Sequence, residues 1–78
     1  MSPALPVVSG AEVLRALGRG GFTQVSQKGS HVKLRKESPT GSLTAIVPMH
    51  DELAPGTLRS ILRQAGLTVD DLLRLLAQ

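Results

Sequence analysis

The chain has 78 residues, of which 41% are hydrophobic and 19% charged, with no cysteine and a single aromatic residue, Phe22. This length allows one small domain, expected over residues 9–78 after an irregular lead-in at 1–8. The absence of cysteine excludes disulfides, thiolate zinc sites and thiol catalysis. The shortage of aromatic residues argues against proteins that stack successive bases on aromatic side chains.

Hydropathy and charge indicate where in the cell the protein acts and what kind of partner it binds. No apolar run approaches the roughly 20 residues that span a bilayer, and the first eight residues lack the regions of a signal peptide. We therefore expect a cytoplasmic protein with no membrane partner. The net charge is +3, and six basic but no acidic residues lie from Val13 to Lys36. The remainder has three basic and six acidic residues, so the basic stretch indicates an anionic partner.

A first helix is predicted from Gly10 to Arg19. It opens on the capping box Ser9-Gly10-Ala11-Glu12, in which the serine and glutamate side chains each accept a backbone hydrogen bond. The glycines that follow Leu17 end its apolar periodicity.

Two further helices are predicted near the C-terminus. One begins at Pro55, whose missing N–H does no harm in a first helical turn, and ends at Gly66. The other is short and begins at Thr68, with Asp70 and Asp71 near the positive end of its dipole.

Between the first two helices the hydrophobic period changes to about two, which predicts strands. A break at Gly29-Ser30 suits a hairpin, and the turn signal from Ser38 to Gly41 precedes a third strand over Leu43 to Val47. Alternation gives the strands an apolar face, expected to meet the core, and a polar, basic face. The apolar set is Val25, Val32, Leu34, Leu43, Ala45 and Val47, and the opposite set is Gln24, Ser26, Lys28, His31, Lys33, Arg35, Thr44 and Ile46.

These elements predict an α+β fold in the order α-β-β-β-α, with a short C-terminal helix added. A three-stranded antiparallel sheet is covered by helices on its apolar face, while its polar face needs no cover. We expect function on the uncovered face.

Two histidines are the candidates for acid-base chemistry. His31 shares its strand face with Lys33 and Arg35, the nearer of them about 7 Å along the strand. A neutral imidazole beside fixed cations suits phosphodiester cleavage. A solvated surface histidine and a merely solubilising basic face explain the same residues, and the pattern alone leaves these alternatives open. His50 is expected to make local hydrogen bonds, and no metal or cofactor site is expected because neither histidine has a second ligand at a recognisable spacing.

Several motifs occur in a characteristic order. They are Gly21-Phe22, Gln27-Lys28-Gly29-Ser30-His31, Val47-Pro48-Met49-His50 and the segment from Leu53 to Leu67. In these motifs the chain resembles the HicA family of bacterial toxins, from Ser9 to about Asp71.

The resemblance implies a fold like that of double-stranded-RNA-binding domains. It also implies an mRNA interferase, a toxin that cleaves RNA without the ribosome and is held inactive by a HicB antitoxin. The catalytic histidine of the family maps onto His31. Many members have a second histidine directly after it, where this chain has Val32, and His50 matches a histidine without an assigned role.

The expected activity is that of a metal-independent endoribonuclease with His31 as general base and the 2′-hydroxyl of the RNA as nucleophile. Lys28, Lys33 and Arg35 are assigned to the phosphates, and Ser30 and Lys36 complete the RNA-binding set. The antitoxin is expected to cover His31, with Ile46 as an apolar anchor.

Two other classes compete with this hypothesis. One is a non-catalytic module that binds double-stranded RNA. The other is a helix-turn-helix DNA reader built from Pro55 to Ala65 and Thr68 to Leu76. The leucines of its second helix make that helix too apolar for a DNA groove.

Overall fold

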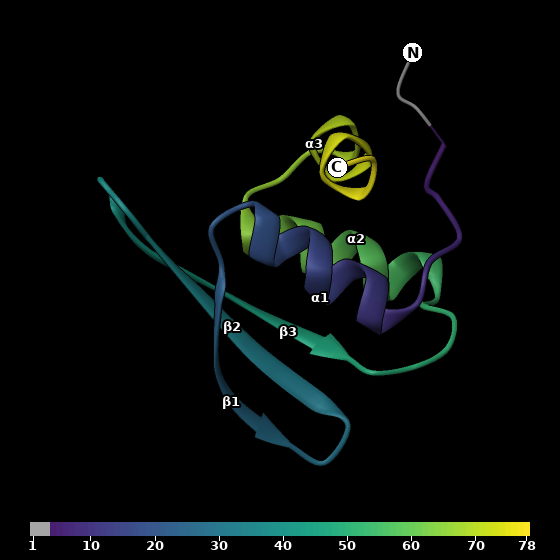
Figure 1. Ribbon diagram of the computed structural model, residues 1–78, viewed down its shortest axis with the longest axis horizontal. Coiled ribbons are helices and arrows are strands. Elements are labelled where there is room, and N and C mark those ends of the chain that lie inside the picture. The colour runs from purple at the N-terminus through teal and green to yellow at the C-terminus, as the bar shows by residue number, and fades with distance from the viewer. Residues whose placement is uncertain (1–3) are drawn as a thin grey trace.

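The computed structural model describes residues 4–78. It confirms the α+β class and the predicted order, with the third strand one to two residues longer at each end than expected (Figure 1). The strands form one antiparallel sheet in the order β1-β2-β3. The elements are α1 (Gly10–Arg19), β1 (Thr23–Lys28), β2 (His31–Ser38), β3 (Gly41–Pro48), α2 (Pro55–Ala65) and α3 (Val69–Leu76).

The described end of the lead-in packs against the core through Leu5 and Val8. Of the residues expected to be irregular, 1–3 lie outside the described residues, and 4–8 form no helix or strand. Val8 is nevertheless buried, and its carbonyl oxygen accepts a hydrogen bond from the Leu53 N–H at 2.8 Å. This bond ties the lead-in to the segment between β3 and α2.

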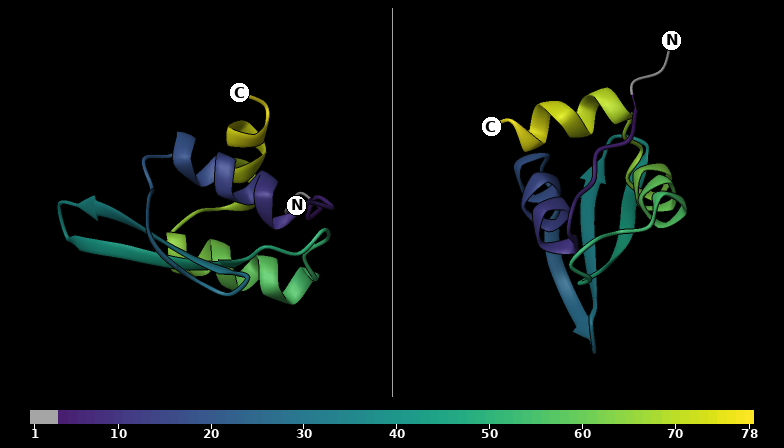
Figure 2. Two further views of the ribbon diagram at one scale, coloured as in Figure 1. Left: turned by 60° about the horizontal axis from the view of Figure 1, so that its bottom comes forward. Right: turned by 90° about the vertical axis from the view of Figure 1, so that its right-hand side faces the viewer.

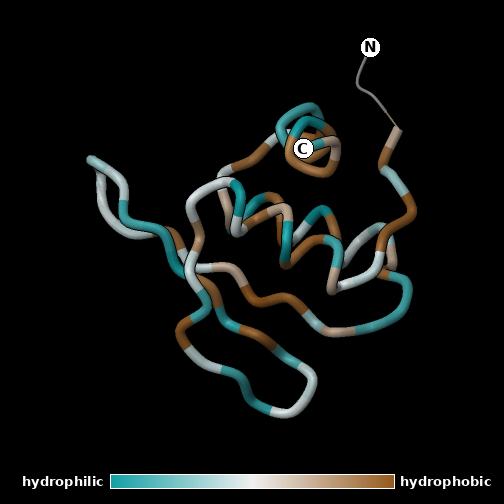
Figure 3. Tube along the Cα trace, viewed as in Figure 1, coloured by the Kyte–Doolittle hydropathy of each residue, from teal (hydrophilic) through white to brown (hydrophobic). Residues whose placement is uncertain are grey.

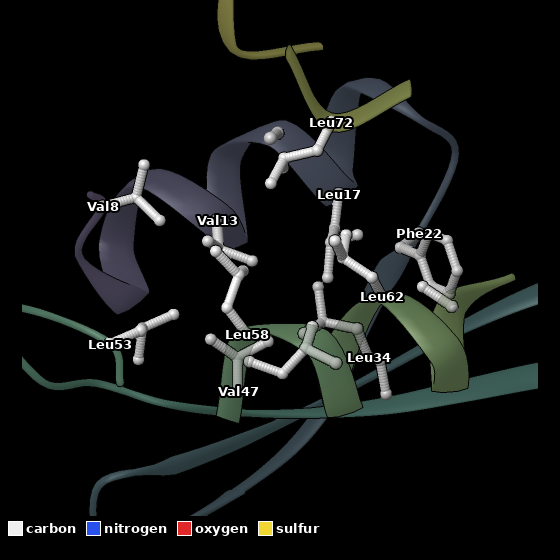
Figure 4. Close-up of a cluster of buried hydrophobic side chains, with 14 of the residues drawn as sticks. Val8, Val13, Leu17, Phe22, Leu34, Val47, Leu53, Leu58, Leu62 and Leu72 are labelled. Atoms are coloured by element: carbon white, nitrogen blue, oxygen red, sulfur yellow. The ribbon is translucent and has the colours of Figure 1, made fainter. Parts of the chain in front are cut away.

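The helices are layered on one side of the sheet. α1 and α2 cover one sheet face, and α3 lies across α1 on the side away from the strands (Figures 1 and 2). The core fills the space between these layers, and Leu72 of α3 lies above Leu17 of α1 within it (Figure 4). Among residues 4–78, no helix lies over the opposite face of the sheet.

The helix starts follow the capping signals. The Ser9 hydroxyl accepts a hydrogen bond from the Glu12 N–H at 3.1 Å, and the Glu12 carboxylate accepts one from the Ser9 N–H at 2.9 Å. This confirms the predicted capping box. Thr68 and Asp71 repeat it at the start of α3. α2 instead begins with Pro55 after Ala54, without a side-chain cap.

The inward position expected for Val25 is wrong. β1 and β2 pair Gln24 with Leu34 and Ser26 with Lys33, so Val25 is an extra residue in a β-bulge. A bulge shifts the parity of a strand. Val25 is therefore 51% exposed, while Gln24 pairs with a residue of the covered face. None of the helices in the described part of the chain covers β1, and all six residues of β1 are exposed.

The β3 edge of the sheet is protected by α2. The Ile46 N–H, which lies on the free side of β3, donates to the Gln64 side-chain oxygen at 2.9 Å. Two residues on, Pro48 has no N–H to leave unpaired. Both features block pairing with another strand along this edge.

Candidate functional site

The uncovered face of the sheet is defined by the cross-strand pairs of β2. Residues directly opposite each other in a sheet share a face. His31 pairs with Lys28 on one side and Pro48 on the other, and Lys33 pairs with Ser26 and Ile46. Arg35 pairs with Thr23 and Thr44. We call this surface the open face: Thr23, Ser26, Lys28, His31, Lys33, Arg35, Thr44 and Ile46.

His31 begins β2 directly after the tight turn at Gly29-Ser30. Gly29 adopts a positive φ of 59°, which suits a glycine in the two-residue connection. The turn places Lys28 opposite His31, so their Cβ atoms are about 5 Å apart. Both residues are exposed. A ligand can therefore reach the imidazole directly from solvent.

The open face carries its cations in a line along β2. Lys33 follows His31 at about 7 Å and Arg35 at about 13 Å, because alternate residues of a strand share a face. Lys33 makes no ion pair among residues 4–78, whereas Arg35 Nε lies 3.0 Å from the Glu37 carboxylate. The charge nearest His31 is thus positive and available to an anion. Figure 3 shows hydrophilic and hydrophobic residues alternating along the first part of β2.

Two members of the predicted RNA-binding set need separate description. Ser30 lies in the exposed turn beside His31, and its carbonyl oxygen accepts a hydrogen bond from the Met49 N–H at 2.7 Å. Lys36 pairs with Leu43 on the covered face. Its Nζ lies 5.9 Å from the centre of the Phe22 ring, close enough for a cation–π interaction. The structure brings Ser30, but not Lys36, next to His31.

His50 lies beyond the end of β3. Its carbonyl oxygen accepts a hydrogen bond from the Gly10 N–H at 2.9 Å, and its side chain is exposed. The backbone of His50 therefore holds the start of α1 against the end of β3.

Burial and residue clustering bear on three further questions from the sequence: a helix-turn-helix that includes α3, a metal site and a membrane-spanning helix. Leu72 of α3 is fully buried, so α3 is packed into the core along that side. No group of three histidine, cysteine or acidic side chains that could hold a metal occurs in the described part of the chain. No helix among these residues has the length and apolar character to cross a membrane.

Some features of the site had no signal in the sequence. The bulge at Val25 and the bond between Gln64 and Ile46 depend on tertiary placement. The pairing of Arg35 with Glu37 is the exception, because residues two apart on a strand share a face and opposite charges at that spacing indicate an ion pair.

Taken together, these features define a small α+β protein with a basic, solvent-facing sheet surface around one histidine. The family model for the HicA toxin of bacterial toxin-antitoxin systems matches residues 10–67. The chain belongs to the HicA family, and membership implies an antitoxin partner. No curated protein gives a significant match. The family match ends before α3 begins at Val69.

Proposed function

We propose that this HicA family toxin is an mRNA interferase, an endoribonuclease that acts without the ribosome and uses His31 as its general base. One observation carries the proposal: an exposed imidazole lies opposite Lys28 and on the same face as Lys33. General base catalysis by a positioned histidine contributes about 10² to 10⁴-fold in rate. Fixed cations stabilise the charge that develops on the phosphate oxygens.

The reaction is a transesterification within the RNA. The imidazole of His31 takes the proton of a 2′-hydroxyl, and the 2′-oxygen attacks the adjacent phosphorus. The bond from phosphorus to the 5′-oxygen of the next nucleotide breaks, and that oxygen takes a proton from solvent. The products are a 2′,3′-cyclic phosphate and a free 5′-hydroxyl, and no metal is required by this scheme.

Substrate binding rests on the cations of the open face. Lys28 and Lys33 flank His31, with Ser30 in the adjoining turn, and Arg35 extends the line along β2. Phosphate contacts position a nucleic acid irrespective of its sequence. DNA should therefore bind to this face and stay intact, since it lacks the nucleophile.

The proposed partner is a HicB antitoxin with an acidic surface that covers the open face. Ile46 lies there beside Lys33 and is 36% exposed, so it offers an apolar contact among the cations. A partner seated over this pair blocks both the substrate and the proton transfer. Replacing Ile46 with Asp should weaken antitoxin binding at least about tenfold, because the new carboxylate would be buried against the acidic surface of the partner.

The decisive experiment is incubation of the purified protein with end-labelled RNA and with an all-deoxy oligonucleotide of the same sequence. We expect cleavage of the RNA alone, 2′,3′-cyclic phosphate ends, and full activity in EDTA. His31→Ala should reduce cleavage at least about 10²-fold while it still binds RNA. His50→Ala is the matched control, because that exposed histidine lies off the open face.

Two outcomes would contradict the proposal. Equal cleavage by His31→Ala would show that another group, or a contaminating nuclease, is responsible. Tight binding of RNA without any cleavage would favour the non-catalytic double-stranded-RNA-binding module, in which His31 is only a contact residue.

A further inference from the structure

An open groove lies at the end of the open face away from His31. Its volume is about 410 Å³, within the roughly 300–1,000 Å³ that is usual for small-ligand sites. β1 begins at Thr23, opposite Arg35, while β2 continues to Ser38, so the groove lies beside the part of β2 that β1 does not pair. Figure 1 shows this extension of the β2–β3 hairpin beyond β1. The groove is lined by Gly21, Thr23, Val25, Arg35, Lys36 and Glu37.

The bulge in β1 gives this groove an apolar wall. Because Val25 is an extra residue between the pairs of Gln24 and Ser26, its side chain lines the groove and is half-exposed. A regular strand with the expected alternation would have turned Val25 toward the helices. The exposed apolar side chain is thus a consequence of the bulge.

Two cations reach the groove from different faces of the sheet. Arg35 belongs to the open face, and its Nε is held 3.0 Å from the Glu37 carboxylate. That pairing restrains the planar guanidinium, which is a surface on which a base can stack. Lys36 reaches the groove from the covered face, where its side chain passes Gly21 and Phe22.

We infer that this groove binds one nucleotide of the RNA several positions from the scissile phosphate, an inference that rests on the proposed function. Lys36 and Arg35 contact the phosphate of that nucleotide, and Val25 with the Arg35 guanidinium contacts its base. Phe22, the only Phe, Tyr or Trp of the chain, is 5% exposed, so the groove itself offers a base the plane of the Arg35 guanidinium and the aliphatic side chain of Val25. The groove is a determinant of substrate selection, separate from the cleavage chemistry at His31.

The charge and position of the groove favour RNA over a protein occupant. Its two cations face a single carboxylate, and that carboxylate is already paired with Arg35. Arg35, which lines the groove, is also the last residue of the row His31, Lys33 and Arg35 along β2, about 13 Å from end to end. An RNA strand bound at His31 along β2 therefore arrives at Val25.

The inference is tested by an abasic scan. A set of RNA oligonucleotides with one cleavage site carries a single abasic nucleotide at each position around that site. We expect one position, displaced from the cut, where loss of the base lowers kcat/KM at least about fivefold, as the loss of one stacked base does. Val25→Ser should abolish that penalty and leave the others unchanged. Lys36→Gln should raise KM without changing kcat.

Val7→Ser is the matched control, because Val7 is 77% exposed and does not line the groove. It should keep the wild-type pattern. The abasic scan is then repeated with His31→Ala, and RNA binding is measured in place of cleavage. We expect a base-sensitive position away from the cleavage site that disappears in the His31→Ala and Val25→Ser double variant. That result supports the groove even if the protein does not cleave RNA.

Three outcomes would overturn the inference. The first is the absence of any base-sensitive position away from the cut. The second is a penalty that Val25→Ser leaves intact. The third is a loss of antitoxin affinity in Val25→Ser and Lys36→Gln with an unchanged abasic profile, which would assign the groove to the antitoxin.

Discussion

The backbone of Gly10 lies directly against that of Pro48, and a Cβ at Gly10 would clash with the Pro48 carbonyl oxygen. The Gly10 N–H also donates to the His50 carbonyl oxygen. Since Pro48 pairs with His31 across the sheet, this contact fixes the start of α1 to the strand ends that carry the candidate base. Only a residue without a side chain permits that approach.

Gly10→Ala should therefore destabilise the protein by about 1–3 kcal/mol, the usual cost of overpacking, because backbone must move to admit the methyl group. Urea unfolding measures this free energy. Gly18→Ala is the control within the same helix, since a Cβ there meets nothing within 4 Å. That change should stabilise the protein by about 0.5–1 kcal/mol. Equal stabilities of the two variants would contradict the tight contact.

The sequence predicted the helices and most of the core because their signals are local. Capping residues and the spacing of apolar residues specify a helix within a few turns, as at Ser9 and Pro55. The placement of Val25 could not be predicted in this way. Its neighbours are polar on both sides, so no alternating apolar pattern fixes the parity of β1.

In the candidate site, too, some residue positions could be predicted from local sequence signals and others could not. Strand alternation is enough to place His31 and Lys33 on one face, and the structure has them there. Charge alone grouped Lys36 with them, although alternation from Leu34 puts it on the covered face. The groove beside Val25 required the bulge and the unequal lengths of β1 and β2, and both depend on how the strands pair.

α3 lies outside the family match, yet it completes the core. Leu72 is fully buried, so Leu72→Ala should cost about 2–5 kcal/mol of stability through lost contacts and a cavity. Leu73→Ala, at a position 36% exposed, should change stability by no more than about 0.5 kcal/mol. Thermal and urea unfolding of the pair would show whether α3 is integral. Equal small effects would mean that it is not.

The hydrogen bond from Ile46 to Gln64 protects the outer edge of β3. Gln64→Ala should leave that N–H to water, with a stability loss of about 0.5–1.5 kcal/mol and faster amide hydrogen exchange at Ile46. Gln64→Glu keeps an acceptor oxygen on a side chain of the same length and should preserve slow exchange at neutral pH. Exchange at Ile46 that ignores both substitutions would show that the bond does not protect the edge.

Two capping carboxylates make stability depend on acid pH. Hydrogen bonds from the Ser9 backbone and side chain lower the pKa of Glu12, and those from Thr68 lower the pKa of Asp71. The unfolded chain therefore takes up protons first as the pH falls. The stabilisation is complete above the ordinary carboxyl pKa of about 4 and is lost as the pH drops through the lowered folded-state values. Urea unfolding of Glu12→Gln with Asp71→Asn should differ from wild type near neutrality and converge with it in acid. A constant difference at all pH values would contradict this.

The salt dependence of RNA binding separates phosphate contacts from a merely solubilising face. Each phosphate contact contributes about 0.7 to the slope of log K against log salt for a single strand. Lys33→Gln in the His31→Ala background should therefore reduce that slope by about 0.7 and weaken binding of every sequence alike. Arg63→Gln removes the same charge from α2, where Arg63 lies with Leu67 and Thr68 at the junction with α3, and should leave the slope unchanged. Equal slopes for both variants would mean that total charge, and not the open face, attracts the RNA. A smaller slope for Lys33→Gln alone would place a phosphate within reach of Lys33, on the same face of β2 as His31.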